Sequence, residues 1–194
     1  MSFDVLDRAH AALRTTAASL TSADLTRPTP CTQWDVAQVL QHAAGDQRAY
    51  AFFLTGADGP TGDPFAPDGA LDGTPLELVE PALEATARAY ADLDPDGTAA
   101  TPLPQGVLPA PTAAGAAALD AAVHAWDIAV AVGLESPLDD DLAAMILPTA
   151  RALVEPLRQW GAYAAELPPV DDGPAGELLR YLGRDPHWTP PAAR

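Results

Sequence analysis

Apolar residues recur along this chain at intervals of three and four positions, the spacing that places them on one face of an α-helix. Within residues 3–20 this stripe consists of Leu6, Ala9, Leu13, Ala17 and Leu20. The same spacing recurs in the later segments 32–54, 74–93, 112–132, 139–160 and 174–182. None of these segments shows the strict alternation of apolar and polar residues that is typical of a half-buried strand. The pattern therefore predicts an all-α protein of five or six helices.

Local capping signals mark the ends of several predicted helices. Thr32 and Asp35 have the spacing of a capping box, which predicts that the second helix starts there. The run Thr74-Pro75-Leu76-Glu77 predicts the start of the third helix, with Thr at the N-cap, Pro at the first helical position and Glu at the third. Gly133 stands in the terminating position of the fourth helix.

Two long connections separate these helices. Residues 56–73 and 98–111 are rich in Pro and Gly and are predicted to be loops. Loops of this length often act as lids or pocket walls, so we expect both to border a functional site. With 194 residues, the chain has the length of one domain. We therefore expect residues 1–194 to form a single helical bundle with long Pro-rich connections.

The charge pattern excludes several chemistries. The formal net charge is −17, and all ten basic residues are Arg, so the chain has no lysine for a Schiff base, a pyridoxal-phosphate anchor or a P-loop. An acidic chain without an Arg cluster repels phosphate backbones, so we expect no nucleic-acid partner.

Cysteine use and hydropathy bear on the compartment. A single cysteine, Cys31, excludes an internal disulfide and fits a reducing compartment. The first ten residues lack the uninterrupted apolar core of a signal peptide, and the run 112–119 is too short to span a bilayer. We therefore expect a cytoplasmic protein with no membrane partner.

The segment 112–132 carries the clearest candidate chemistry. Asp120, His124 and Asp127 follow one another at offsets of four and three, so they stack on one side of a helix that is otherwise mostly Ala and Val. Buried ionisable groups require partners. An Asp and a His four residues apart can chelate one divalent ion, but they can equally form a buried hydrogen bond. Spacing alone leaves both interpretations open.

A third metal ligand has to come from another segment, and the other histidines are His10, His42 and His187. His42 lies mid-helix at the edge of an apolar stripe, where it faces a neighbouring helix of a bundle. His10 has charged residues nearby in its helix, which favours a surface position. His187 lies in the C-terminal tail. There it is part of a lid, caps the site or has no role, and the sequence leaves these alternatives open.

Three sequence segments carry a family resemblance. They are Pro28-Thr29-Pro30-Cys31-x-x-Trp34-Asp35-Val36 with Leu40-x-His42, then Asp120-x-x-x-His124-Ala125-Trp126-Asp127-Ile128-Ala129, and Leu182-Gly183-Arg184-Asp185-Pro186-x-Trp188. In order and spacing they resemble the mycothiol-dependent maleylpyruvate isomerase-like proteins. The closer resemblance is to the actinobacterial branch of metal-binding proteins within the DinB-like superfamily. The segments cover both ends and the middle of the chain.

The resemblance implies a DinB-like four-helix bundle with additional short helices and one divalent metal ion. Carried over, the metal ligands are His42, Asp120 and His124. Many relatives have Glu where this chain has Asp120, and the shorter side chain either pulls the helix closer or makes a weaker ligand. Nitrogen and oxygen ligands are compatible with Zn, the metal we expect, and also with Ni, Fe or Mn.

The resemblance also implies a reaction. Two histidines and one carboxylate leave a metal position open, as catalytic zinc sites do. Active relatives use such a site to activate a low-molecular-weight thiol, such as mycothiol. The implied function is a metal-dependent enzyme that takes a small thiol and an electrophilic substrate, for S-transfer or thiol-assisted isomerisation. Alternatives are a non-catalytic metal- or ligand-binding protein, and a hydrolase or lyase of secondary metabolism that uses metal-bound water. Both a monomer and a dimer are compatible with the sequence.

Four further residues have two interpretations each. Asp127 either orients a ligand imidazole or caps the polar ladder structurally. Asp46, one turn after His42, is either a fourth ligand or proton acceptor, or a solvated residue. Arg48 binds an anionic substrate or forms a surface ion pair. Cys31 is either a nucleophile or a packing residue beside a helix start.

Overall fold

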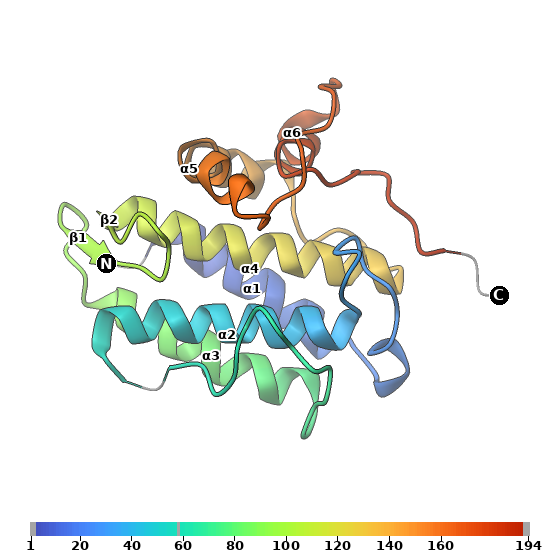
Figure 1. Cartoon of the computed structure of the whole chain (residues 1–194), viewed down its shortest axis with the longest axis horizontal. Helices are drawn as coiled ribbons and strands as arrows, with labels where there is room; N and C mark the ends of the chain where they lie inside the picture. Colours follow the sequence, from blue (N-terminus) through green and yellow to red (C-terminus); the bar gives the residue numbers. More distant parts are fainter. Residues whose placement is uncertain (1–2, 58, 192–194) are drawn as a thin grey trace.

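The computed structural model describes residues 3–57 and 59–191, and helices dominate it. Four long helices lie side by side as a bundle: α1 (Asp4–Ala18), α2 (Val36–Thr55), α3 (Pro75–Ala91) and α4 (Ala110–Val132). Helix α2 packs on α3 and α4, and α1 packs on the same two helices (Figure 1). The prediction of an all-α four-helix bundle is confirmed.

The remaining elements are short or lie outside the bundle. A 3₁₀ turn, η1 (Ser22–Asp24), follows α1. Helix α5 (Asp140–Gln159) packs on α4, and α6 (Gly173–Tyr181) packs on α5. These two helices form the additional layer at the top of Figure 1.

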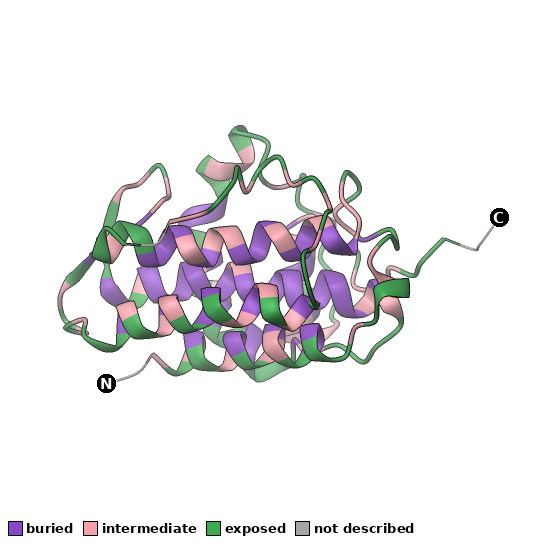
Figure 2. Cartoon of the chain, turned by 90° about the horizontal axis from the view of Figure 1, so that it is seen from below, coloured by how far each residue is buried: buried purple, intermediate pink, exposed green. Residues whose placement is uncertain are grey.

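Helix α4 is the core helix because other helices cover it on both sides. Its side chains are mostly alanines, which are buried together with Trp126 and Ile128. Figure 2 shows buried residues along the faces that the helices turn toward one another. By length and composition α4 is apolar enough to cross a membrane, but 83% of its most apolar window is buried within the protein, as in the core helix of a bundle. Gly115 allows α5 to approach, since a Cβ there would clash with the side chain of Thr149.

The helix boundaries confirm two of the capping predictions and correct one. Thr74 caps α3 through a capping box with Glu77, and Gly133 ends α4 with a left-handed φ of 78°. The predicted box at Thr32 is wrong, because the N-cap of α2 is Asp35, which pairs with Gln38. The chain is still extended at Asp35, where a β-bridge joins it to Pro28, so the helix begins one residue later.

The second Pro-rich connection is not wholly a loop. It contains a short antiparallel hairpin of β1 (Thr98–Ala100) and β2 (Val107–Pro109). Strands of three residues are too short to show an alternating pattern, so periodicity did not reveal them. In the first connection, the described residues 56–57 and 59–73 are irregular, as predicted.

Candidate metal centre

Helices α2 and α4 bring the three predicted ligands together. His42 lies on α2, whereas Asp120 and His124 lie one turn apart on α4. Their ligand atoms all lie within 4.8 Å of one another. Asp120 Oδ1 is 3.5 Å from His124 Nε2 and 3.9 Å from His42 Nε2. All three side chains are close to fully buried, with 8–11% of their surface exposed.

Each histidine has one ring nitrogen occupied and the other directed at this group. His42 Nδ1 lies 2.9 Å from the carbonyl oxygen of Pro64, which can only accept a hydrogen bond. His124 Nδ1 lies 3.0 Å from Asp127 Oδ2. With the proton on Nδ1 in both rings, the Nε2 lone pairs are free. Metal-binding histidines are oriented by this kind of contact to a carbonyl or carboxylate.

The arrangement fits a divalent cation. Ligand atoms at about 2.0–2.2 Å from a tetrahedral zinc ion lie about 3.3–3.6 Å from one another. The separations of 3.5 and 3.9 Å from Asp120 Oδ1 to the two Nε2 atoms are close to that range. Two imidazoles and one carboxylate also match the ligand set of zinc sites that keep one position open.

Burial sets the electrostatics of the group. It lowers the pKa of His124 to about 4, so the imidazole is neutral at pH 7 and its lone pair is available. Burial, followed by the neighbouring charge of Asp46, raises the pKa of Asp120 well above its ordinary value. A buried carboxylate beside a second one favours the uptake of a cation, which supplies the missing positive charge.

Asp46 is not a solvated residue, which was one of the alternatives that the sequence left open. Its side chain is 21% exposed, and Oδ2 lies 3.7 Å from His42 Nε2. The position one turn after His42 on α2 directs this carboxylate toward the ligand group. Burial raises the pKa of Asp46, although His42 opposes the shift. This placement agrees with the alternative that gave Asp46 a role at the site.

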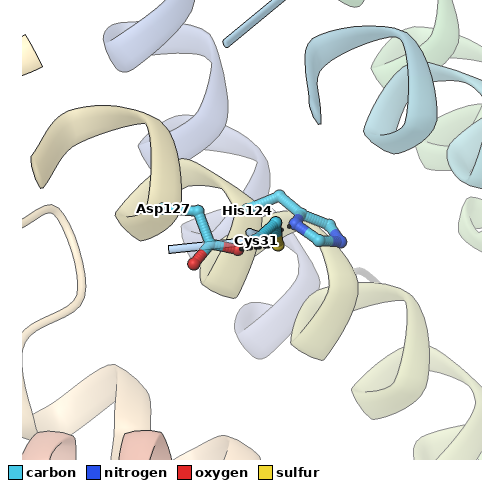
Figure 3. A group of neighbouring side chains, drawn as sticks. All are labelled: Cys31, His124 and Asp127. Carbon is cyan, nitrogen blue, oxygen red and sulfur yellow. Dashed lines mark hydrogen bonds and ion pairs between the residues drawn. The ribbon is translucent and has the colours of Figure 1, made fainter. Parts of the chain in front are cut away.

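A charged network lies on the far side of His124. Arg184, from the segment after α6, donates to both carboxylate oxygens of Asp127 at 2.8 Å. The Cys31 thiol donates to Asp127 Oδ2 at 3.2 Å and accepts from Arg184 at 3.3 Å. Figure 3 shows Cys31 and His124 beside the Asp127 carboxylate. Burial alone would raise the pKa of Asp127, but Arg184 and His124 hold it well below its ordinary value.

Cys31, His124 and Asp127 also lie close enough to form a ligand group, with their donor atoms within 4.8 Å of one another. The guanidinium of Arg184 already occupies both oxygens of Asp127 and repels a cation. Burial and the charge of Asp127 raise the pKa of the Cys31 thiol, so the sulfur keeps its proton. These contacts favour a hydrogen-bonded network over a second metal site, and they argue against Cys31 as a thiolate nucleophile.

A neutral network lies behind Asp120. Gln47 on α2 donates to Asp120 Oδ2 at 3.2 Å and to the carbonyl of Ala117 at 3.0 Å. Its amide oxygen lies 2.9 Å from His10 Nε2. The predicted surface position of His10 is wrong, because α1 turns this residue toward α2 and only 3% of it is exposed.

Among the described residues, no hydrogen bond or ion pair joins Arg48 or His187 to the ligand group. Arg48 borders a hollow of about 400 Å³ between α2 and residues 60–72, which is lined in part by Pro64. His187 is exposed in the C-terminal segment. Neither is brought to the candidate centre.

Aromatic side chains from two loops lie against His42. The ring centroid of Trp34 is 4.6 Å from that of His42, and the ring centroid of Phe65 is 5.5 Å from it. Phe65 belongs to the connection 56–73, so this loop borders the candidate centre. The connection 98–111 was also expected there, but its hairpin lies at the N-terminal end of α4, where the Ala110 N–H donates to the carbonyl of Gly97.

Gln47 and Arg184 are the site residues that sequence reasoning missed. Arg184 belongs to the C-terminal motif that carried the family resemblance, but nothing in its spacing linked it to Asp127. Gln47 is a neutral residue within a helical segment and has no comparable signal.

Comparisons with known proteins agree with this architecture. The family model for the mycothiol maleylpyruvate isomerase N-terminal domain matches residues 6–129. Uncharacterized proteins from two strains of Mycobacterium tuberculosis are each 35% identical to this chain over 181 residues, which is 91% of this chain and 94% of theirs. The crystal structure of a histidine-to-alanine mutant of mycothiol-dependent maleylpyruvate isomerase matches with a TM-score of 0.62 at 17% identity. That match covers 97% of this chain and 94% of the other, and it confirms the expected DinB-like fold.

Proposed function

Because the chain belongs to the mycothiol maleylpyruvate isomerase N-terminal domain family, we propose that it is a divalent-metal-dependent enzyme that uses a small thiol such as mycothiol. The reaction class is S-transfer to an electrophilic substrate or thiol-assisted isomerisation. The observation that carries the proposal is the convergence of His42 Nε2, His124 Nε2 and Asp120 Oδ1 with both Nδ1 atoms occupied.

The proposed ligands are His42, Asp120 and His124, and zinc is the metal we expect, with Ni, Fe or Mn as the other compatible ions. When bound, such an ion supplies Lewis acidity that lowers the pKa of a thiol in its open position. The chain contributes two Nε2 atoms: burial keeps the His124 imidazole neutral, and the Pro64 carbonyl occupies Nδ1 of His42.

Asp46 is the proposed proton acceptor. Its Oδ2 lies beside His42 Nε2, at the ligand group and with part of its surface exposed. Because burial raises its pKa, this carboxylate is a stronger base than an exposed aspartate. In this role Asp46 takes the thiol proton at Oδ2.

Trp34 and Phe65 form the proposed substrate wall. Their rings lie against His42 and come from different loops. Apolar rings exclude water and pack against an uncharged part of the thiol or the electrophile. A small-thiol cosubstrate also fits the cytoplasmic location expected from the sequence.

Metal analysis of the purified protein tests the ligand assignment first. We expect about one divalent ion per chain in the wild type and a loss of metal in His42→Ala. His187→Ala is the matched control, because it removes an exposed histidine away from the site. Equal metal content in all three proteins would contradict the assignment.

Conjugation then tests the reaction. The metal-loaded protein is incubated with mycothiol and monobromobimane, and the fluorescent thioether is measured against the uncatalysed rate. We expect acceleration by the wild type and a loss of at least about 100-fold in Asp46→Asn, in line with the usual contribution of a general base. If the protein holds one metal ion per chain but does not accelerate the conjugation, thiol transfer to this electrophile is refuted. The alternative of a non-catalytic metal-binding protein would then be favoured.

A further inference from the structure

A buried, uncharged chain of hydrogen bonds connects three helices to the candidate ligand Asp120. It runs from His10 on α1 to Gln47 on α2, and from Gln47 to Asp120 Oδ2 on α4. His10 is 3% exposed and Gln47 is fully buried. The function proposed above assigns no role to either residue.

The contacts determine which way the Gln47 amide points. The carbonyl of Ala117 can only accept a hydrogen bond, so the atom 3.0 Å away must be the amide nitrogen of Gln47. The amide oxygen therefore faces His10, whose Nε2 lies 2.9 Å away and must carry a proton to donate to it. The reversed amide would place two acceptors, its own oxygen and the Ala117 carbonyl, against each other.

Only one of the two carboxylate oxygens of Asp120 accepts a hydrogen bond from the Gln47 amide. Oδ2 accepts from Gln47 Nε2 at 3.2 Å. Oδ1 lies 3.5 Å from His124 Nε2 and 3.9 Å from His42 Nε2. A carboxylate with one oxygen held in this way presents the other as a single ligand atom.

We propose that His10 and Gln47 are positioning residues that hold Asp120 Oδ2 and so present Oδ1 alone to a cation at His42 and His124. This inference rests on the proposed function, since it concerns the same centre. His10 holds the amide of Gln47 in one orientation, and Gln47 holds the carboxylate. Neither residue touches the cation or the substrate.

The two residues that hold Asp120 in place, His10 and Gln47, carry no charge. An amide donor orients Asp120 without adding a positive charge of its own, so the carboxylate can still pair with the cation. A guanidinium in the same place would neutralise the carboxylate, as Arg184 does for Asp127. Burial lowers the pKa of His10, which keeps the far end of the chain uncharged at neutral pH.

The test replaces Gln47 with Met, which fills similar space and cannot donate a hydrogen bond. The control is Thr86→Val, because Thr86 Oγ1 donates to the backbone carbonyl of the same Gln47 at 2.6 Å and is also fully buried. Zn²⁺ affinity is measured by competition with a chromophoric chelator, and the Co²⁺-substituted proteins are compared by visible absorption. Thermal unfolding and circular dichroism report folding for every variant.

We expect Gln47→Met to bind Zn²⁺ about 10–100-fold more weakly, the usual loss when a residue that orients a metal ligand is removed. Its Co²⁺ bands should weaken, because a freed carboxylate binds through both oxygens and raises the coordination number. Thr86→Val should lower the unfolding temperature but keep the wild-type affinity and Co²⁺ spectrum. His10→Phe should weaken binding in the same direction, and His10→Gln, which restores a donor near the Nε2 position, should recover it.

Equal Zn²⁺ affinity and an unchanged Co²⁺ spectrum in Gln47→Met would overturn the positioning role while leaving the metal site intact. Equal losses in Gln47→Met and Thr86→Val would also overturn it, because general destabilisation would then explain both. A wild-type protein that binds no metal would refute the proposed function, and this inference with it.

Discussion

Two buried networks reach the candidate centre from opposite sides, and they differ in charge. Behind His124, the Asp127 carboxylate is held by the guanidinium of Arg184 and by the Cys31 thiol. Behind Asp120, only neutral groups take part, the amide of Gln47 and the imidazole of His10. Asp127, Gln47 and His10 are buried, and the Arg184 side chain is only 12% exposed, so the difference does not arise from solvent.

The proposed roles of the two carboxylates account for this difference. Asp127 orients an imidazole and is itself buried, so a permanent cation must stabilise its charge. Asp120 is a proposed ligand, and its charge has to remain available for a metal ion. The Gln47 amide orients the Asp120 carboxylate without neutralising it. A guanidinium in the same position would neutralise the carboxylate and weaken its attraction for a cation.

The largest expected effect comes from removing the cation of the charged network. Arg184→Ala leaves the Asp127 carboxylate buried without its partner, and breaking such a pair costs about 3–5 kcal/mol of unfolding free energy. Urea denaturation of wild type and variant measures this loss. Arg151→Ala is the matched control, since its ion pair with Glu177 is about half exposed and should contribute about 1 kcal/mol or less. Similar losses in both variants would show that Asp127 does not need its cation.

An intermediate effect is expected from pH. The pKa of His124 is lowered from 6.5 to about 4 by burial, so between these values the unfolded chain holds a proton that the folded chain lacks. Stability therefore falls as the pH decreases, by about 2 kcal/mol between pH 7 and 5 for this group. Urea denaturation of the metal-free protein across this range measures the fall.

His124→Gln should show a shallower decrease than the wild type. Part of the decrease remains in the variant, because burial also lowers the pKa of His10. The difference between the two proteins isolates the share of His124. An identical pH dependence would mean that folding leaves the pKa of His124 unchanged, and would contradict the claim that burial keeps this imidazole neutral.

The smallest effect is expected at Cys31. A serine hydroxyl can donate to Asp127 and accept from Arg184 in the same positions, so Cys31→Ser should change the unfolding free energy by about 1 kcal/mol or less. Metal content and thiol conjugation should stay at wild-type levels. Loss of either would place Cys31 among the ligands or make it a nucleophile, and the charged network would then be part of the reacting centre.

Much of the fold was predictable because helices are local. The apolar stripes and the Thr74 and Gly133 caps depend on neighbours within one or two turns, and the structure confirms them. The errors arose where contacts distant in sequence intervene. The bridge between Pro28 and Asp35 delays the helix until Val36, with a turn at Thr32, and the short hairpin in 98–111 pairs residues several positions apart.

The candidate site was predictable in part for the same reason. Asp120 and His124 share one turn of one helix, so their spacing paired them. His42 came from the family resemblance, because no local rule relates α2 to α4. His10 was misplaced, since the charged residues around it say nothing about which face α2 covers.

The sequence by itself determined the helical periods, the caps, the absence of lysine chemistry and the Asp120–His124 pair, all of which follow from composition or from geometry within one helix. Only the tertiary structure decided that Arg184 reaches Asp127 across 57 positions and that Gln47 reaches Asp120 across 73. Buried polar groups need partners, but burial does not specify which partners they find. The packing of α1, α2 and the C-terminal segment around α4 determines which partner each buried polar group contacts.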